Sequence, residues 1–112
     1  MKLIFVGTDK EPFVLDMEDE LNNFQSLVGG LIEVYTIKTK KNRSIDFIFN
    51  EEYEYLFSEI NKTVITKEGY VINVKGNILV IAANEETGEF ENLTEEEIKF
   101  YLTFLLDDKL FI

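Results

Sequence analysis

Residues 77–83 read NILVIAA, and this stretch decides how the chain folds. A strand with one face in water alternates apolar and polar residues, whereas this run is apolar without a break after its first residue. A short unbroken run of this kind is typical of a strand buried on both of its faces. We therefore expect residues 77–83 to form a central strand of the sheet.

Shorter segments before this run carry the β-branched and aromatic residues of further strands. The expected strands are residues 2–6, 12–16, 31–37, 45–50 and 70–74. The sequence GTDKE, which begins at the permissive residue Gly7, is expected to join the first two as a hairpin. The polar stretch KTKKNRS, residues 38–44, is expected to form the turn between the third and the fourth.

A first helix is expected over residues 17–30, MEDELNNFQSLVGG. Acidic residues fill its first turn, where they complement the helix dipole. Its apolar residues at helical spacing, which we expect to face the core, are Leu21, Phe24, Leu27 and Val28. Gly29 and Gly30 are expected to end the helix, because glycine takes the left-handed conformation of a C-cap without a steric clash.

A second helix is expected to begin at Thr94. Thr94 and Glu97 have the spacing of a capping box, and Leu93 and Ile98 occupy the positions of a hydrophobic staple. The apolar stripe that would face the core consists of Ile98, Tyr101, Leu102 and Leu105. Phe100 and Phe104 point nearly to the opposite side, since each residue advances about 100° around a helix.

These two phenylalanines allow two interpretations. The helix is either sandwiched within its own domain, or the two rings face a partner, which would be a second copy of the chain or a target protein. Residues 51–65 are also open to two interpretations. Tyr53, Leu56, Phe57 and Ile60 have the spacing of a short helix, whereas Tyr53, Tyr55 and Phe57 alternate as in a strand.

The predicted fold is a single α+β domain over residues 1–112. It has an antiparallel or mixed sheet of about five or six strands covered by two main α-helices. With 112 residues, ten Phe and five Tyr, the chain can bury a sizeable core. It has no cysteine, no signal-peptide pattern and no apolar stretch of membrane-spanning length, so we expect a cytoplasmic protein.

Charge is the unusual feature of the composition. The net charge is −11, from 22 acidic and 11 basic residues. Because phosphate contacts supply most of the affinity of nucleic-acid-binding proteins, this charge argues against direct binding of DNA, RNA or an anionic membrane. The acidic residues are densest in NEETGEFENLTEEE, residues 84–97, which contains no lysine or arginine. The basic residues are densest in KTKKNR, residues 38–43.

The residues needed for most catalytic sites are missing. The chain has no histidine and no cysteine, which removes the usual general bases, nucleophile pairs and soft metal ligands. The acidic run 84–97 does not match the spacing of a calcium-binding loop. We therefore expect no enzymatic activity, no metal site and no cofactor.

The order of the motifs resembles a family of small uncharacterised domains that phages and plasmids of low-GC and gut bacteria encode. The segments that carry the resemblance are FQSLVGGLIEV (24–34), NEE (50–52), VKGNILVIAANEETGEFENLTEEEI (74–98) and the closing apolar helix. The chain departs from the pattern over residues 53–68, where a stretch with proline and arginine is expected. The resemblance implies a fold and a genetic setting rather than a reaction.

The hypothesis for function is therefore a binding protein. An acidic domain from a mobile element is suited to occupy the basic nucleic-acid groove of a host immune effector, and a CRISPR-Cas nuclease is the most concrete target. Such a protein would be a non-catalytic anti-CRISPR, or counter-defence, inhibitor. Its expected partner-binding residues are Glu85, Glu86, Glu89, Phe90, Glu91, Glu95, Glu96, Phe100 and Phe104.

Two alternatives remain open. One is a sponge that sequesters a nucleotide immune signal, and the residues that would hold the nucleotide are Lys40, Lys41, Arg43, Tyr53 and Tyr55. The other is an accessory or regulatory interaction protein of mobile elements, whose acidity serves only solubility.

Overall fold

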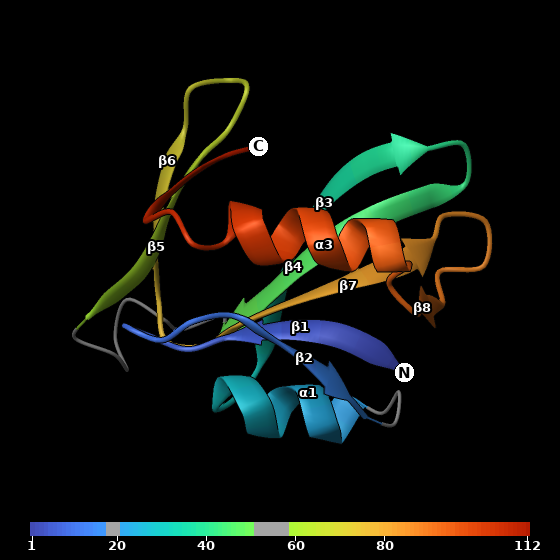
Figure 1. Ribbon diagram of the computed structural model, residues 1–112, viewed down its shortest axis with the longest axis horizontal. Coiled ribbons are helices and arrows are strands. Elements are labelled where there is room, and N and C mark those ends of the chain that lie inside the picture. The colour runs from blue at the N-terminus through green and yellow to red at the C-terminus, as the bar shows by residue number, and fades with distance from the viewer. Residues whose placement is uncertain (18–20, 51–58) are drawn as a thin grey trace.

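The computed structural model describes residues 1–17, 21–50 and 59–112 (Figure 1). Within these residues the chain is an α+β domain with two helices and two sheets. The helices are α1 (Leu21–Val28) and α3 (Glu95–Phe104). The strands are β1 (Lys2–Val6), β2 (Phe13–Asp16), β3 (Ile32–Lys40), β4 (Arg43–Asn50), β5 (Ile60–Ile65), β6 (Val71–Lys75), β7 (Ile78–Asn84), β8 (Phe90–Glu91) and β9 (Lys109–Phe111). The predicted α+β class is confirmed.

The larger sheet is built around β7, as the sequence predicts. Its strand order is β2-β1-β7-β4-β3, and the short strand β8 also pairs with β7. All of these pairs are antiparallel. Every residue of β7 before Asn84 is buried, so the prediction of a central strand buried on both faces is confirmed.

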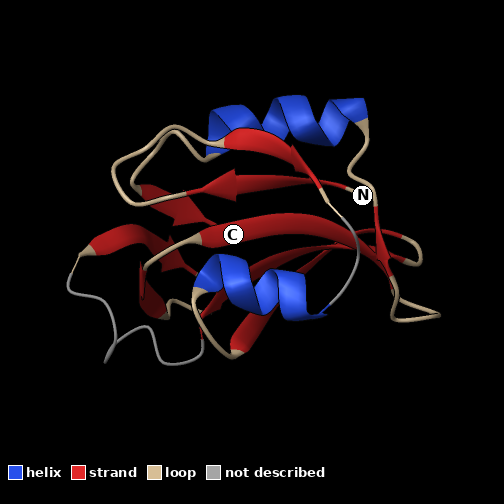
Figure 2. Ribbon diagram, turned by 90° about the horizontal axis from the view of Figure 1, so that it is seen from below, coloured by secondary structure: helices blue, strands red, loops and turns tan. Residues whose placement is uncertain are grey.

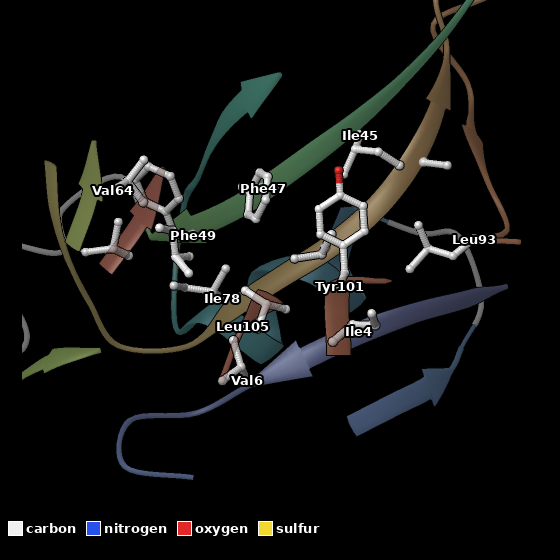
Figure 3. Packing of buried hydrophobic residues seen from close by; sticks show 14 residues of the cluster. Ile4, Val6, Ile45, Phe47, Phe49, Val64, Ile78, Leu93, Tyr101 and Leu105 are labelled. Atoms are coloured by element: carbon white, nitrogen blue, oxygen red, sulfur yellow. The ribbon is translucent and has the colours of Figure 1, made fainter. Parts of the chain in front are cut away.

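The two faces of β7 belong to two separate parts of the core. Leu79 and Ile81 pack on one face with Phe24 of α1. Ile78, Val80 and Ala82 alternate with them and face the other way. This second set packs with residues of α3 and of the smaller sheet, including Tyr101, Leu105, Val64 and Leu110 (Figure 3). The two helices consequently lie on opposite sides of the strands (Figure 2).

The smaller sheet was not predicted. It contains β5, β6 and β9 in the order β6-β5-β9, and β5 and β9 are parallel. It covers part of the face that α3 also covers, so the picture of one sheet covered by two helices holds only in part. The last strand was missed because only three residues form it; Leu110, at its centre, is fully buried.

The hairpin between β3 and β4 is tighter than the sequence predicts. Both strands run into the polar stretch, so the turn holds only Lys41 and Asn42, and Asn42 has a left-handed backbone (φ 60°). β3 is an edge strand of the larger sheet, where lysines keep their side chains in water while the backbone pairs. The predicted turn within residues 38–44 is confirmed, but its bounds were too wide, and Lys38, Lys40 and Arg43 lie on strands.

Helix α1 ends where the sequence predicts. Gly29 has a left-handed backbone (φ 86°), and the amides of Gly29 and Gly30 both donate to the carbonyl oxygen of Gln25. Phe24 and Val28 are buried as expected. The acidic residues 18–20 of the predicted first turn lie outside the described residues, as do Tyr53, Tyr55, Leu56 and Phe57; Ile60 begins β5.

Candidate functional site

Arg43, the first residue of β4, binds both the middle and the end of the acidic segment, residues 84–97. Its Nε donates to Oε2 of Glu97 at 2.9 Å, and its Nη2 donates to Oε1 of the same carboxylate. Its Nη1 donates to Oε2 of Glu91 at 2.8 Å, and Nη2 also donates to the carbonyl oxygen of Asn92 at 2.9 Å. The forked shape of the guanidinium allows this simultaneous binding.

Glu97 has a second role at the start of α3. The backbone amide of Thr94 donates to Oε1 of Glu97, and the amide of Glu97 donates to Oγ1 of Thr94, at 2.8 and 3.1 Å. The predicted capping box is therefore confirmed. The hydrogen bond from Arg43 lowers the pKa of Glu97, and the same bond raises the pKa of Arg43. Both groups are charged at neutral pH, and the pair holds α3 to β4.

The loop between β7 and β8 is held by its own backbone. The amide of Asn84 donates to the carbonyl oxygen of Glu89, and the amide of Gly88 donates back to that of Asn84, both at 2.8 Å. The side-chain oxygen of Asn84 accepts from the amides of Glu86 and Thr87. Gly88 has a left-handed backbone (φ 73°). The backbone of the acidic loop therefore has a defined shape, from which the glutamate side chains project.

The loop also contacts the basic hairpin. The amide of Glu85 donates to the carbonyl oxygen of Asn42 at 3.1 Å, and its carboxylate lies 3.7 Å from Lys38 Nζ. The Lys38 side chain is 79% exposed, so this ion pair is weak. The sequence suggested two separate surfaces, one acidic and one basic. The structure places them side by side, and part of the acidic run is neutralised within the molecule.

The predicted glutamates divide into two groups. Glu85 and Glu91 have basic partners in Lys38 and Arg43. The other four are Glu86, Glu89, Glu95 and Glu96, which are all exposed. Among the described residues none of these four has a basic group within 4 Å. We call them the free glutamates.

The three predicted aromatic anchors lie in different environments. Phe90 packs edge-on against Phe24 of α1, with 5.2 Å between ring centroids, and so is partly buried against the core. Its orientation follows from its pairing with Ala83, whose side of β7 faces α1. Phe104 is partly buried against the core, whereas Phe100 is 59% exposed and stacks on Phe104 at 5.8 Å.

A shallow hollow of about 210 Å³ lies between the start of α3 and the β3–β4 hairpin. Lys40 lines it from the hairpin, and Glu96 and Phe100 line it from α3. Tyr101 also lines it, and burial raises the pKa of its hydroxyl. An exposed ring beside free carboxylates can make an apolar contact at the centre of a charged interface. This combination is the candidate binding site.

Sequence reasoning did not find the role of Arg43, which it assigned to a nucleotide site. Four acceptors from Glu91, Asn92 and Glu97 occupy its guanidinium, so it is not free for a phosphate. Lys40 and Lys41 are exposed, and Tyr53 and Tyr55 lie outside the described residues. One signal was present in the sequence: Arg43 is the single arginine of the chain, within a stretch of lysines.

Two negative observations apply to the described part of the chain. In residues 1–17, 21–50 and 59–112, no three acidic side chains converge in a way that could hold a metal ion. In the same ranges neither helix has the length and apolar character needed to span a membrane.

Comparison with known proteins gives one match. No curated protein and no solved structure is significantly similar to this chain. A family pattern does match, and it extends over residues 1–106, from the start of the chain to just beyond α3. The match covers both helices, the larger sheet and the acidic segment. The chain therefore belongs to the family described as a domain of unknown function, DUF3846.

Proposed function

We propose that the protein is a non-catalytic binding protein that places the free glutamates and Phe100 on a basic groove of another protein. The observation that carries the proposal is the double engagement of Arg43 by Glu91 and Glu97. This arginine fixes the acidic loop relative to the first turn of α3. The backbone segments that carry the free glutamates are thus held in place before a partner arrives, which lowers the backbone entropy lost on binding.

The kind of partner follows from the charge. A surface of one sign attracts an oppositely charged surface over long distances and speeds association. Basic grooves in bacterial proteins are mostly nucleic-acid channels, because phosphates require lysine and arginine. The net charge of −11 makes the chain a competitor for such a channel rather than a ligand of nucleic acid.

The proposed setting is counter-defence in a bacterial cytoplasm. It rests on the resemblance to domains from phages and plasmids, where inhibition of a host immune nuclease is advantageous. On this proposal the protein is an anti-CRISPR, and its partner is a CRISPR-Cas effector whose nucleic-acid channel it occupies. The exposed ring of Phe100 supplies the apolar contact that charge alone does not.

The experiment has two steps. The tagged protein is first used to capture proteins from the bacterial host at low salt, and a captured nucleic-acid-binding protein is then purified. In the second step, binding is measured against increasing salt and against competing DNA or RNA. Occupation of the channel predicts that salt weakens binding and that nucleic acid and this protein exclude each other.

A matched pair of variants tests the surface. The first changes Glu86, Glu89, Glu95 and Glu96 to glutamine, and the control changes four exposed acids elsewhere, Glu33→Gln, Glu59→Gln, Glu68→Gln and Asp107→Asn. Both lose the same charge, so only the position differs. If the two variants bound the nuclease equally well, the proposed surface would be wrong.

The competing interpretations predict other outcomes. An accessory protein held by Phe100 and Phe104 would keep its partner at high salt. A sponge would release a nucleotide when the purified protein is denatured. No contact among the described residues favours the nucleotide site, since Arg43 is already bound by carboxylates.

A further inference from the structure

A second cavity lies at the opposite end of α3 from the candidate site. Its volume is about 550 Å³, and its walls come from the loop between β1 and β2, the start of β5 and the end of α3. A volume of this size is in the range of sites for small molecules. The α3 helix has ten residues, so at about 1.5 Å per residue its two ends are some 15 Å apart.

Lys62 is the unusual residue in this cavity. It lies on β5 opposite Val74, on the side of the smaller sheet that faces the core, and the residue is only 5% exposed. In the ranges that the structure describes, no carboxylate lies within 4 Å of its ammonium group. The ammonium is not cut off from solvent, so it meets the water of the cavity, where an anionic group that enters can pair with it.

The other charged residues of the wall limit which anions can enter. Asp9, Glu11 and Asp108 also line the cavity, together with Lys10. The lining therefore holds more negative than positive charge, which repels a ligand with phosphate groups. A ligand that carries one carboxylate and one ammonium can pair with the basic and the acidic residues of the wall at the same time.

The remaining wall is partly apolar. Ile60 and Leu106 are large exposed side chains that line the cavity beside the buried Leu105. They would contact an aliphatic side chain, and covering them would remove apolar surface from water.

We propose that this cavity binds a small zwitterion, either an α-amino acid with an aliphatic side chain or a short peptide of such residues. Lys62 binds the carboxylate, and the carboxylates of Asp9, Glu11 and Asp108 attract the ammonium group. The site is separate from the acidic surface, so either proposal can fail without the other.

The test is a titration of the ¹⁵N-labelled protein, followed by NMR, with four probes. L-leucine and the dipeptide Leu-Leu carry both charges, 4-methylpentanoate lacks the ammonium group, and 3-methylbutylamine lacks the carboxylate. We expect saturable shifts of the amides of Asn61, Lys62 and Thr63 with a doubly charged probe. Each singly charged probe should bind about tenfold more weakly, the change that corresponds to one lost charge-assisted hydrogen bond.

Three variants make the test specific. Lys62→Met keeps the length of the side chain and should weaken L-leucine about tenfold or more, whereas Lys67→Met, at an exposed lysine outside the cavity, should have no effect. Asp108→Asn, at an exposed position that does not threaten folding, should weaken L-leucine but not 4-methylpentanoate.

The relative affinities of the probes distinguish the possible ligands. Tighter binding of L-leucine than of Leu-Leu identifies a free amino acid as the ligand, and the reverse identifies a peptide. Absence of saturable shifts with both, or equal binding by the wild type and by both the Lys62 and Asp108 variants, would overturn the proposal.

Discussion

Arg43 and Glu97 are separated by 54 positions in the sequence and are joined by a two-pronged hydrogen bond between guanidinium and carboxylate. The side chains are 19% and 17% exposed. The pair connects the larger sheet to the capped start of α3, and through Glu91 it also holds β8. The position of the candidate binding surface therefore depends on one arginine.

Replacing Arg43 with methionine should destabilise the protein by about 2 kcal/mol, because two partly buried carboxylates lose a charged donor. Urea denaturation followed by circular dichroism measures the change. The matched control is Lys38→Met, which removes only an exposed pair and should cost less than about 0.5 kcal/mol. Equal losses in the two variants would contradict the role given to Arg43.

The acid stability of the protein should depend on Glu97. The hydrogen bond from Arg43 lowers its pKa from the ordinary value of 4.5 in the folded state. A carboxylate with a lowered folded pKa adds stability above its unfolded pKa, and this stability is lost as the pH falls through the folded value. Glu97→Gln should therefore be less stable than the wild type at pH 7, and the difference should shrink below about pH 4.5. Denaturation curves at several pH values test this, and a difference that stayed constant would contradict it.

Asp46 should have the opposite effect. It is buried on β4 near Ser44, and burial raises its pKa. A raised folded pKa means that the charged carboxylate costs stability at neutral pH, and that this cost disappears as the pH falls and the group is protonated. Asp46→Asn keeps one oxygen that can accept a hydroxyl from Ser44 or Thr36 and removes the buried charge, so it should be more stable than the wild type at pH 7. Thermal denaturation at pH 7 and pH 4 would show whether the gain is confined to the higher pH.

Two residues of the α3 region, Phe100 within the helix and Leu105 just after it, should separate binding from folding. Phe100 is exposed, so Phe100→Ala should change the free energy of unfolding by less than about 1 kcal/mol while weakening the proposed partner interaction. Leu105 is fully buried, and Leu105→Ala should cost about 2–5 kcal/mol. Measurements of unfolding and of partner binding on both variants show whether Phe100 acts in binding and Leu105 in stability. If the folded Phe100→Ala variant bound the partner normally, the Phe100 ring would not be part of the binding site.

Features encoded in neighbouring residues could be predicted from the sequence. The unbroken apolar run identified the central strand β7, and the spacing of Thr94 and Glu97 identified the capping box. Gly29 marked the end of α1 for the same reason, since its backbone conformation is a local property. In each case the signal lies within one or two turns of helix or within one strand.

Features that depend on contacts between distant residues could not be predicted in this way. Whether Phe90 faces solvent or the core is decided by the register of a two-residue strand on Ala83. Arg43 pairs with Glu97 only because β4 and α3 meet in space. The acidic run therefore looked uniform in the sequence, although the fold neutralises part of it and leaves four glutamates free.

The parallel pairing of β5 with β9 has a consequence for how the chain reaches its final structure. It joins Thr63–Ile65 to Lys109–Phe111, with β6, β7, β8 and α3 between them in the sequence. A ribosome makes β5 and β6 well before β9, so the nascent chain carries a two-stranded hairpin that lacks its third strand. Such a hairpin is marginally stable on its own, and contacts between distant segments form slowly. The smaller sheet should be the last part of the molecule to form, with Leu110 closing the core.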